Sequence, residues 1–427
     1  MTTSTQTRSA RGMTLVEVMV AGALLAVVIS ATMAGLLGAN QASERVRRVG
    51  DVQETARLAL EAIAADIRSA GMGAQLGVVG VAPLNGNARR LPVIYAGLDT
   101  TVTDSYNGVT TAMQSNSIFI ISGQPATGVL SGDGTGMVGT VVKATAGNPP
   151  VTPATVFVTC YRGPTAVNVD CSDVSVSSNF GEYTVVNPLA GGGYQPLLIG
   201  DFRNGVYLRP TAITTPPLPP TLPEKGDPRQ QLTFIEQSSP AFSPDPRAPF
   251  GFAPGAVLQR ARVLHYYLKA AARGDYYELR RSQPILADDA GNGRGDNTDF
   301  PFIDETNSSN GPVGVPIGSG PIESLQIRYI ADAGATDLPV NFTIVPLSTG
   351  DGATMPKIRE IRVQVVARSL NPDKASDGSL RMSYSTPSYE TSIYPGAVPT
   401  NTAYVDPYPR RTFSITVVPR NLQGVRL

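Results

Sequence analysis

Residues 11–17 read RGMTLVE, and they open an apolar run that continues to Leu37. Within Met13 to Leu37 the only charged residue is Glu17. A helix of about 20 apolar residues crosses the hydrocarbon core of a bilayer, so this run is long enough to span a membrane. An ordinary secretory signal peptide has its small-residue cleavage site after the apolar region. Here the small residue, Gly12, precedes it, so a cut between Gly12 and Met13 would leave the apolar helix in the mature protein.

Glu17 is unusual because a charge inside a membrane helix costs roughly 2.5–3.5 kcal/mol on insertion scales, and such residues are usually functional. A cut after Gly12 would create a new amino terminus at Met13, one helical turn from Glu17. A free amine and a carboxylate on neighbouring copies could then neutralise each other within a bundle of helices, which would offset the cost of burial.

This arrangement resembles the type IV prepilin family, which has a short basic leader, a glycine, a hydrophobic residue, Thr-Leu-Val-Glu and an apolar helix. The resemblance implies that prepilin peptidase cuts between Gly12 and Met13 and N-methylates Met13. It also implies that Glu17 acts in subunit assembly. The alternative is an ordinary signal anchor with an incidental glutamate near its end.

The helix is expected to continue beyond the membrane, because apolar residues recur at steps of three or four along the next stretch. These residues are Val46, Val49, Val52, Ala56, Leu60, Ile63 and Ile67. Gly71 and Gly73 supply a stop. A helix from about Met13 to Ala70 would be about 85 Å long. We expect its first half to lie in lipid or in a filament core, and the stripe from Val46 to Ile67 to pack on a head domain.

The remainder is typical of strands and loops: 43 glycines and 36 prolines indicate many turns. The expected strands are 117–122, 139–144, 155–161, 256–269, 276–282, 323–330, 357–369 and 411–418, each β-branched or aromatic and bounded by turn residues. Segments 257–269 and 275–281 look like a hairpin. The fold class predicted is α+β, type IV pilin-like, with a long N-terminal helix packed on an antiparallel β-sheet head with large loop insertions.

Five regions are expected along the chain. They are a prepilin leader (1–12), the transmembrane or filament-core half of the helix (13–39), its amphipathic half (40–71), a β- and loop-rich insertion region (72–255) and the β-sheet part of the head (256–427). Formal net charge is zero, and no basic run lies outside the leader, so we expect no nucleic-acid partner.

Three further segments, 54–71, 358–369 and 410–421, resemble PilW-type minor pilins, which are related to J-type minor pseudopilins. The resemblance implies a non-enzymatic subunit of the tip complex that primes a type IV pilus and serves adhesion and twitching motility. Its partners would be other minor pilins, the major pilin and a PilY-type tip adhesin. It would lie in the inner membrane, head in the periplasm, and later at the pilus tip on the cell surface. Alternatives are a minor pseudopilin of type II secretion and a signal-anchored envelope enzyme or ligand-binding protein.

Cys160 and Cys171 are the only cysteines. In a chain exported behind a membrane helix, a disulfide between them is the natural interpretation, and it would contribute about 2–3 kcal/mol. Two free thiols are the alternative. His265 is the only histidine and is far away in sequence, so the pair cannot build a structural zinc site unaided.

The best candidate for a metal site is the acidic loop from Asp288 to Asp299. The oxygen ligands for calcium would come from Asp288, Asn292, Asp296 and Asp299, at positions 1, 5, 9 and 12 of an EF-hand-like loop. Position 3 is an alanine and no strong helices flank the loop. The alternative is a solvated turn that binds no metal. Calcium is the one cofactor that the sequence suggests, and no other cofactor is expected.

No motif of nucleophilic or metalloenzyme catalysis is present: the sequence has no GxSxG and no HExxH. Residues 134–139 match GxGxxG by letter, but a strand-like stretch follows where a dinucleotide site needs a helix. His265 is expected to be a strand residue. Tyr266, Tyr267, Tyr276 and Tyr277 could present a surface to a partner, but cross-strand packing is the preferred interpretation.

Overall fold

The computed structural model describes residues 13–72 without a break and a set of shorter segments beyond them. Those segments are 78–81, 89–96, 100–106, 109–124, 140–145, 154–159, 184–185, 193–194, 197–200, 205–208, 210–214, 230–234, 256–272, 276–286, 302–303, 313–318, 320–331, 337–338, 358–374, 379–380, 384–385 and 405–419.

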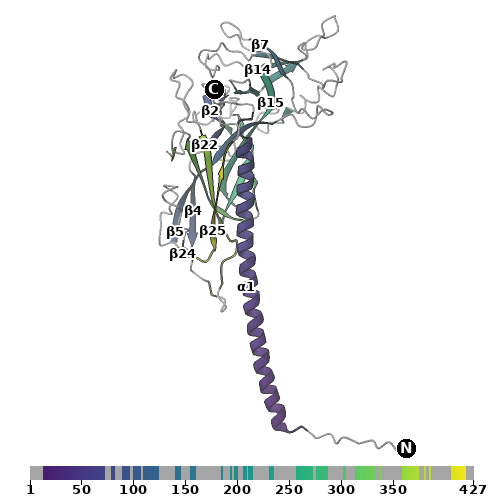
Figure 1. Cartoon of the computed structure of the whole chain (residues 1–427), viewed down its shortest axis with the longest axis vertical. Helices are drawn as coiled ribbons and strands as arrows, with labels where there is room; N and C mark the ends of the chain where they lie inside the picture. Colours follow the sequence, from purple (N-terminus) through teal and green to yellow (C-terminus); the bar gives the residue numbers. More distant parts are fainter. Residues whose placement is uncertain are drawn as a thin grey trace, which may run out of the picture.

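A single helix, α1 (Leu15–Ser69, 55 residues), runs from below the head up into it (Figure 1). At 1.5 Å per residue it is about 82 Å long. Thr14 caps its start. At its end the N–H of Ala70 donates to the carbonyl of Ile67, and Gly71 takes a positive φ of 72°, a backbone conformation that favours glycine. The predicted helix is confirmed, with bounds one or two residues inside those expected.

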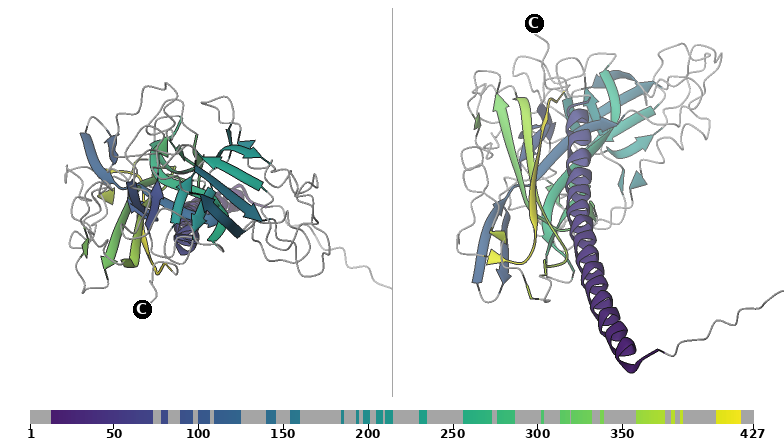
Figure 2. Two further views of the ribbon diagram at one scale, coloured as in Figure 1. Left: turned by 90° about the horizontal axis from the view of Figure 1, so that it is seen from above. Right: turned by 60° about the horizontal axis from the view of Figure 1, so that its bottom comes forward.

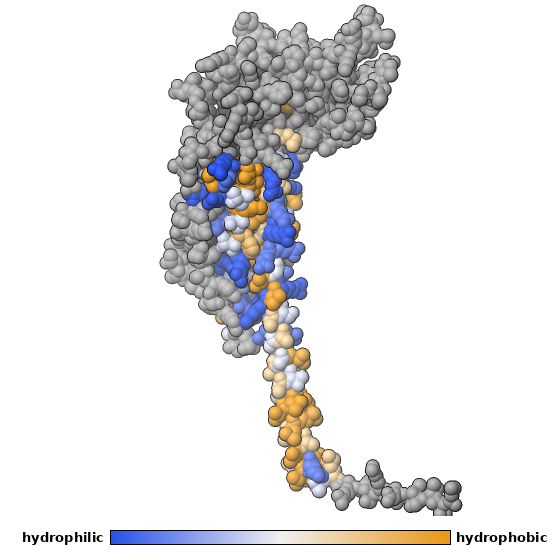
Figure 3. All heavy atoms as spheres, in the orientation of Figure 1, coloured by the Kyte–Doolittle hydropathy of each residue, from blue (hydrophilic) through white to orange (hydrophobic). Residues whose placement is uncertain are grey.

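The two halves of α1 have different surroundings (Figure 3). The half near the N-terminus projects from the head, and its large apolar side chains are exposed. The other half buries one face, and the buried residues are Val52, Thr55, Ala56, Ala59, Leu60, Ile63, Ala64, Asp66 and Ile67.

The expectation that the packing stripe begins at Val46 is wrong, since Val46 is 74% exposed. The buried face begins six residues later, at Val52. Around Val46 the helix meets the head through polar contacts of Arg45 and Arg48 instead. The spacing of apolar residues predicts which face of a helix is buried, but not the residue along the helix at which that burial begins.

The larger of two main sheets has 13 strands and is organised around β15 (Ala256–Ala270). Antiparallel neighbours of β15 are β6 (Ile118–Gln124), β7 (Thr140–Thr145), β11 (Leu197–Gly200) and β16 (Tyr277–Ser282). The remaining strands are β1 (Val78–Val81), β2 (Arg89–Pro92), β3 (Ile94–Ala96), β8 (Ala154–Thr159), β12 (Gly205–Leu208), β13 (Pro210–Thr214), β14 (Gln230–Phe234) and β19 (Val315–Pro316). The expected hairpin is confirmed as β15–β16, with Tyr266 opposite Arg281.

The second main sheet has four antiparallel strands in the order β21-β20-β22-β25. They are β20 (Ile322–Ala331), β21 (Asp337–Leu338), β22 (Ile358–Arg368) and β25 (Arg410–Val417). Two-stranded sheets join β4 (Thr100–Tyr106) to β5 (Val109–Ser115), β9 (Thr184–Val185) to β10 (Gly193–Tyr194), β17 (Ile285–Leu286) to β18 (Phe302–Ile303) and β23 (Tyr384–Ser385) to β24 (Val405–Asp406). All eight expected strands are present, with bounds that shift by at most two residues.

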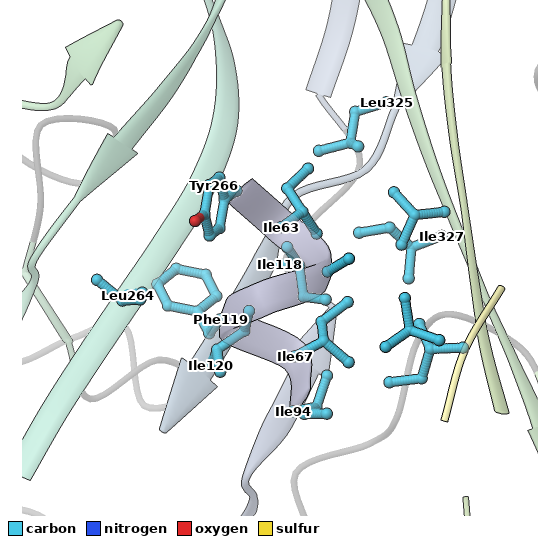
Figure 4. Close-up of a cluster of buried hydrophobic side chains, with 14 of the residues drawn as sticks. Ile63, Ile67, Ile94, Ile118, Phe119, Ile120, Leu264, Tyr266, Leu325 and Ile327 are labelled. Atoms are coloured by element: carbon cyan, nitrogen blue, oxygen red, sulfur yellow. The ribbon is translucent and has the colours of Figure 1, made fainter. Parts of the chain in front are cut away.

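The hydrophobic core lies where α1 meets both sheets (Figure 4). Ile63 and Ile67 of the helix, Ile118 of β6 and Ile327 of β20 belong to one buried cluster. In the tilted view on the right of Figure 2, the second half of α1 lies against the sheets. The predicted α+β class is therefore confirmed: a long N-terminal helix packs on antiparallel sheets.

The boundary expected between residues 255 and 256 does not separate two bodies. The large sheet contains strands from both sides of this boundary. Strand β6, from residues 72–255, pairs with β15, from residues 256–427, over seven residue pairs. Ile94, Ile118 and Leu198 belong to the same core cluster as Leu264. The part of residues 72–255 that the structure describes is thus part of the head.

Candidate assembly site on the long helix

The start of α1 is closed by a capping box formed by Thr14 and Glu17. The Thr14 N–H donates to Oε2 of Glu17 at 2.9 Å, and the Thr14 hydroxyl donates to the same oxygen at 3.1 Å. The Glu17 N–H lies 3.4 Å from the Thr14 hydroxyl oxygen. The box satisfies backbone donors that the first turn of a helix otherwise leaves open, and it places a carboxylate at the positive end of the helix dipole.

Of the residues expected to form the processing and assembly site, Met13 and Glu17 are described, and Gly12 lies outside the described residues. Met13 is 69% exposed and Glu17 is also exposed. The role of Thr14 as the hydrogen-bond partner of Glu17 was not predicted. Its signal was present in the sequence, because threonine followed three residues later by glutamate before an apolar run is the pattern of a capping box.

The apolar half of α1 is a large uncovered hydrophobic surface. By length and composition, the helix can cross a membrane, and none of its apolar window is buried within the chain. Two hydroxyls in it are satisfied locally: Ser30 donates to the Ala26 carbonyl and Thr32 to the Val28 carbonyl, both at 2.7 Å. Hydroxyls bonded in this way are compatible with hydrocarbon, where every polar group needs an internal partner.

Where α1 leaves the head, two arginines hold it to the loop after β22. Arg48 donates to the Pro372 carbonyl at 2.9 Å, and its guanidinium lies 3.6 Å from the carboxylate of Asp373. Arg45 lies 3.5 Å from the same carboxylate, whose side chain is 7% exposed. These contacts fix the point at which the free half of the helix begins.

At the other end of the helix, the buried carboxylate of Asp66 accepts a hydrogen bond from the Tyr266 hydroxyl. Arg262 and Arg281 each lie 3.6 Å from Asp66. The pKa of Tyr266 is raised well above its ordinary value, mainly by burial and to a smaller extent by the hydrogen bond to Asp66. The positive charge of Arg281 opposes that rise. The last turn of α1 is thus fastened to β15 and β16 by polar groups.

A second buried ionic cluster lies inside the four-stranded sheet. Arg410 donates to Glu323 at 3.0 Å and also binds Asp406, and Arg368 lies 3.2 Å from Glu323. Burial lowers the pKa of Arg410, but the charges of Glu323 and Asp406 outweigh it and raise the pKa above the ordinary arginine value. Arg368 also stacks over the ring of Tyr408 at 4.5 Å. This cluster joins the C-terminal strand to β20 and β22.

The other predicted site residues lie outside the described part of the chain. They are the cysteines Cys160 and Cys171 and the calcium candidates Asp288, Asn292, Asp296 and Asp299. Among the residues that the structure does describe, no group of three or more histidine, cysteine, aspartate or glutamate side chains could hold a metal ion.

His265 is a buried residue of β15, as predicted. Its ring stacks on Phe119 at 3.6 Å and on Tyr267 at 4.7 Å between centroids. Tyr266 and Tyr267 are buried, so their contribution is to packing within the head.

No family model matches the chain, and no curated protein matches its sequence. Among solved structures, the chain is similar to a type IV-like pilin from Thermus thermophilus, with 18% identity and a TM-score of 0.20. The alignment covers 38% of this chain and 69% of that one. A TM-score this low carries no argument, so the fold assignment rests on the helix and sheets described above.

Proposed function

We propose that this chain is a minor pilin of a type IV pilus, of the PilW type. In this role it is a structural subunit, not an enzyme, in the tip complex that initiates pilus assembly and helps display a tip adhesin. Its partners are other minor pilins, the major pilin and a PilY-type adhesin, and prepilin peptidase processes it in the inner membrane.

One observation supports the proposal most directly. One half of helix α1 is buried in the core of the head, and the other half is an apolar helix that no described part of the chain covers. Ile63 and Ile67 are fully buried in the head, whereas Leu24 and Leu25 on the same helix are about 60% exposed. At roughly 25 cal/mol per Å² of apolar surface, such a rod is strongly unfavourable in water, so lipid or other helices must cover it. A subunit stored in a membrane and then packed into a filament meets both requirements.

Glu17 is the second support, because it is the only charged residue between Met13 and Leu37. Within the chain, the Glu17 carboxylate accepts a hydrogen bond from Thr14. Two separable roles are therefore available to this carboxylate. As a hydrogen-bond acceptor it caps the helix, and as a charge it can pair with the amino terminus that cleavage after Gly12 would create on a neighbouring subunit.

The first experiment combines amino-terminal mass spectrometry of the protein from cells with electron microscopy of surface pili in a strain lacking the gene. The proposal predicts an N-methylated Met13 and the loss or strong reduction of pili. Normal pili with failed protein secretion would assign the chain to a type II pseudopilin instead. An unprocessed terminus at Met1 or Thr2 would exclude both kinds of pilin-like subunit.

A pair of variants then separates the roles of Glu17. Glu17→Gln keeps an oxygen that accepts from the Thr14 N–H but removes the charge, whereas Glu17→Ala removes both. If the charge acts in assembly, both variants lose pili to a similar extent. If the cap is what matters, Glu17→Gln assembles normally and only Glu17→Ala fails.

Two features predicted from the sequence remain proposals with their own tests. A disulfide between Cys160 and Cys171 predicts a loss of two mass units relative to the reduced chain and no alkylation without reductant. Calcium binding by Asp288, Asn292, Asp296 and Asp299 predicts a calorimetric signal that Asp288→Asn and Asp296→Asn together abolish.

A further inference from the structure

Two arginines share one carboxylate at the end of α1 that lies within the head. Arg262 Nη1 lies 3.6 Å from Oδ1 of Asp66, and Arg281 Nη1 lies 3.6 Å from Oδ2. Hydrogen bonds between charged groups are shorter, about 2.7–2.9 Å. Asp66 accepts a hydrogen bond from the Tyr266 hydroxyl instead. Both guanidinium groups are therefore attracted to Asp66 by charge, but at these distances Asp66 does not satisfy their N–H donors.

Counted over the described residues, the cluster carries an excess of positive charge. Two arginines and one aspartate leave a net charge of one, and the carboxyl end of the helix contributes only about half a negative charge. The nearby Arg280 does not change the balance, because it pairs with Glu278 at 2.6 Å. Nε of Arg262 is buried and has no hydrogen-bond partner among the described residues. An unmet buried donor costs about 1–3 kcal/mol, but this nitrogen is closed to solvent, so an approaching acceptor can reach only the outer nitrogens of the two guanidinium groups.

The sheet register brings these donors to one place. Arg262 and Tyr266 lie four residues apart on β15 and so share one face of the sheet. Arg281 on β16 is directly opposite Tyr266. The side chains of Arg262 and Arg281 are 24% and 38% exposed, so their outer donors remain open to an approaching group. Guanidinium groups are planar forks that match the two oxygens of a carboxylate.

We propose that Arg262 and Arg281 form an oxyanion site that binds an acidic side chain of a neighbouring subunit. The inference that a subunit supplies the carboxylate rests on the proposed function, and charge complementarity argues for an acidic partner. Because the site sits on the last turn of α1, an occupied site would fasten the helix, the two strands of the hairpin and the neighbour at one point. Free sulfate or phosphate offers the same chemistry from a different source.

The chemistry is tested on the full chain in detergent by titrating sodium sulfate at constant ionic strength and following the arginine Nε–H signals by NMR. Saturable shifts are expected in the wild type, with affinity at least about tenfold lower in Arg281→Gln, since charge-assisted bonds are lost. Arg359→Gln is the matched control, because Arg359 is exposed and pairs only with its neighbour Glu360 among the described residues. Absence of saturable binding, or an equal loss in both variants, would overturn the site.

The source of the anion is tested in cells with the charge reversal Arg281→Glu. We expect pilus numbers to fall at least about tenfold, and to recover when an acidic residue of one neighbouring subunit is changed to lysine. If sulfate binds in vitro but Arg281→Glu assembles normally and the gene deletion does not, the site takes free anions only and the proposed function stands. If the gene deletion itself leaves pili unchanged, the proposed function fails while the NMR result still decides whether the site exists.

Discussion

Replacing Ile63 by alanine tests whether the helix is part of the core of the head. Ile63 is fully buried beside Ile118 and Ile327 (Figure 4). The change removes three carbon groups, each worth about 0.8 kcal/mol when buried, so the transfer loss is about 2.4 kcal/mol. An unfilled cavity adds to this, and measured losses for such changes are about 2–5 kcal/mol. The better helix propensity of alanine returns only a few tenths. We expect Ile63→Ala to lower the free energy of unfolding by about 3 kcal/mol.

The assay is urea unfolding of the detergent-solubilised chain followed by far-ultraviolet circular dichroism, since the chain has no tryptophan. Leu58→Ala is the control, because Leu58 lies on the same helix and is 45% exposed. It should change stability by less than about 1 kcal/mol. Equal losses in the two variants, or a loss below about 1 kcal/mol for Ile63→Ala, would refute the conclusion that α1 completes the core.

Three further substitutions probe the polar and close contacts of the head. Arg410→Met leaves the buried carboxylate of Glu323 without its main partner, so urea unfolding should show a loss of about 3–5 kcal/mol. Tyr266→Phe removes a hydroxyl whose pKa is raised on folding. That hydroxyl stabilises the fold fully below about pH 10, the ordinary tyrosine pKa, and less above it. The stability gap between wild type and variant should therefore stay constant from pH 8 to about pH 10 and be smaller at pH 11. Gly320→Ala would place a Cβ 2.8 Å from Oγ1 of Thr55, so it should cost about 1–3 kcal/mol, and adding Thr55→Ala should recover most of that loss.

The helix and the strands could be predicted from the sequence because each has a local, periodic signal. The apolar run, the spacing of Val52, Ala56 and Ile63, and the β-branched segment 358–368 can be interpreted without knowing their partners. The face of the helix was predicted correctly and its lower limit was not. Val46 continues the apolar spacing but is 74% exposed, and at this height the helix contacts the head through Arg45 and Arg48.

The polar contacts of the head could not be predicted, because their partners are distant in sequence. Asp66 and Tyr266 are 200 residues apart, and Glu323 and Arg410 are 87 apart. Each residue by itself is typical of a solvated surface, and only the register of β15, β20 and β25 brings the charges into contact. Thr14 differs, because its capping signal is local: a threonine followed three residues later by a glutamate can be recognised from the sequence alone.

On the proposed function, the free half of α1 is the part that assembles, and the head is the part that can vary. Residues 13–37 are exposed along their whole length within the described chain. Polar contacts at Arg45 to Arg48 and at Asp66 bound the docked half, and the core cluster between them joins α1 to both sheets. Strands β7 and β14 lie at the end of the head farthest from the N-terminus (Figure 1). On the proposed function, the strands at that end can change without altering the free half of α1 or its buried face from Val52 to Ile67, and these two surfaces are the ones that a common mode of assembly would need.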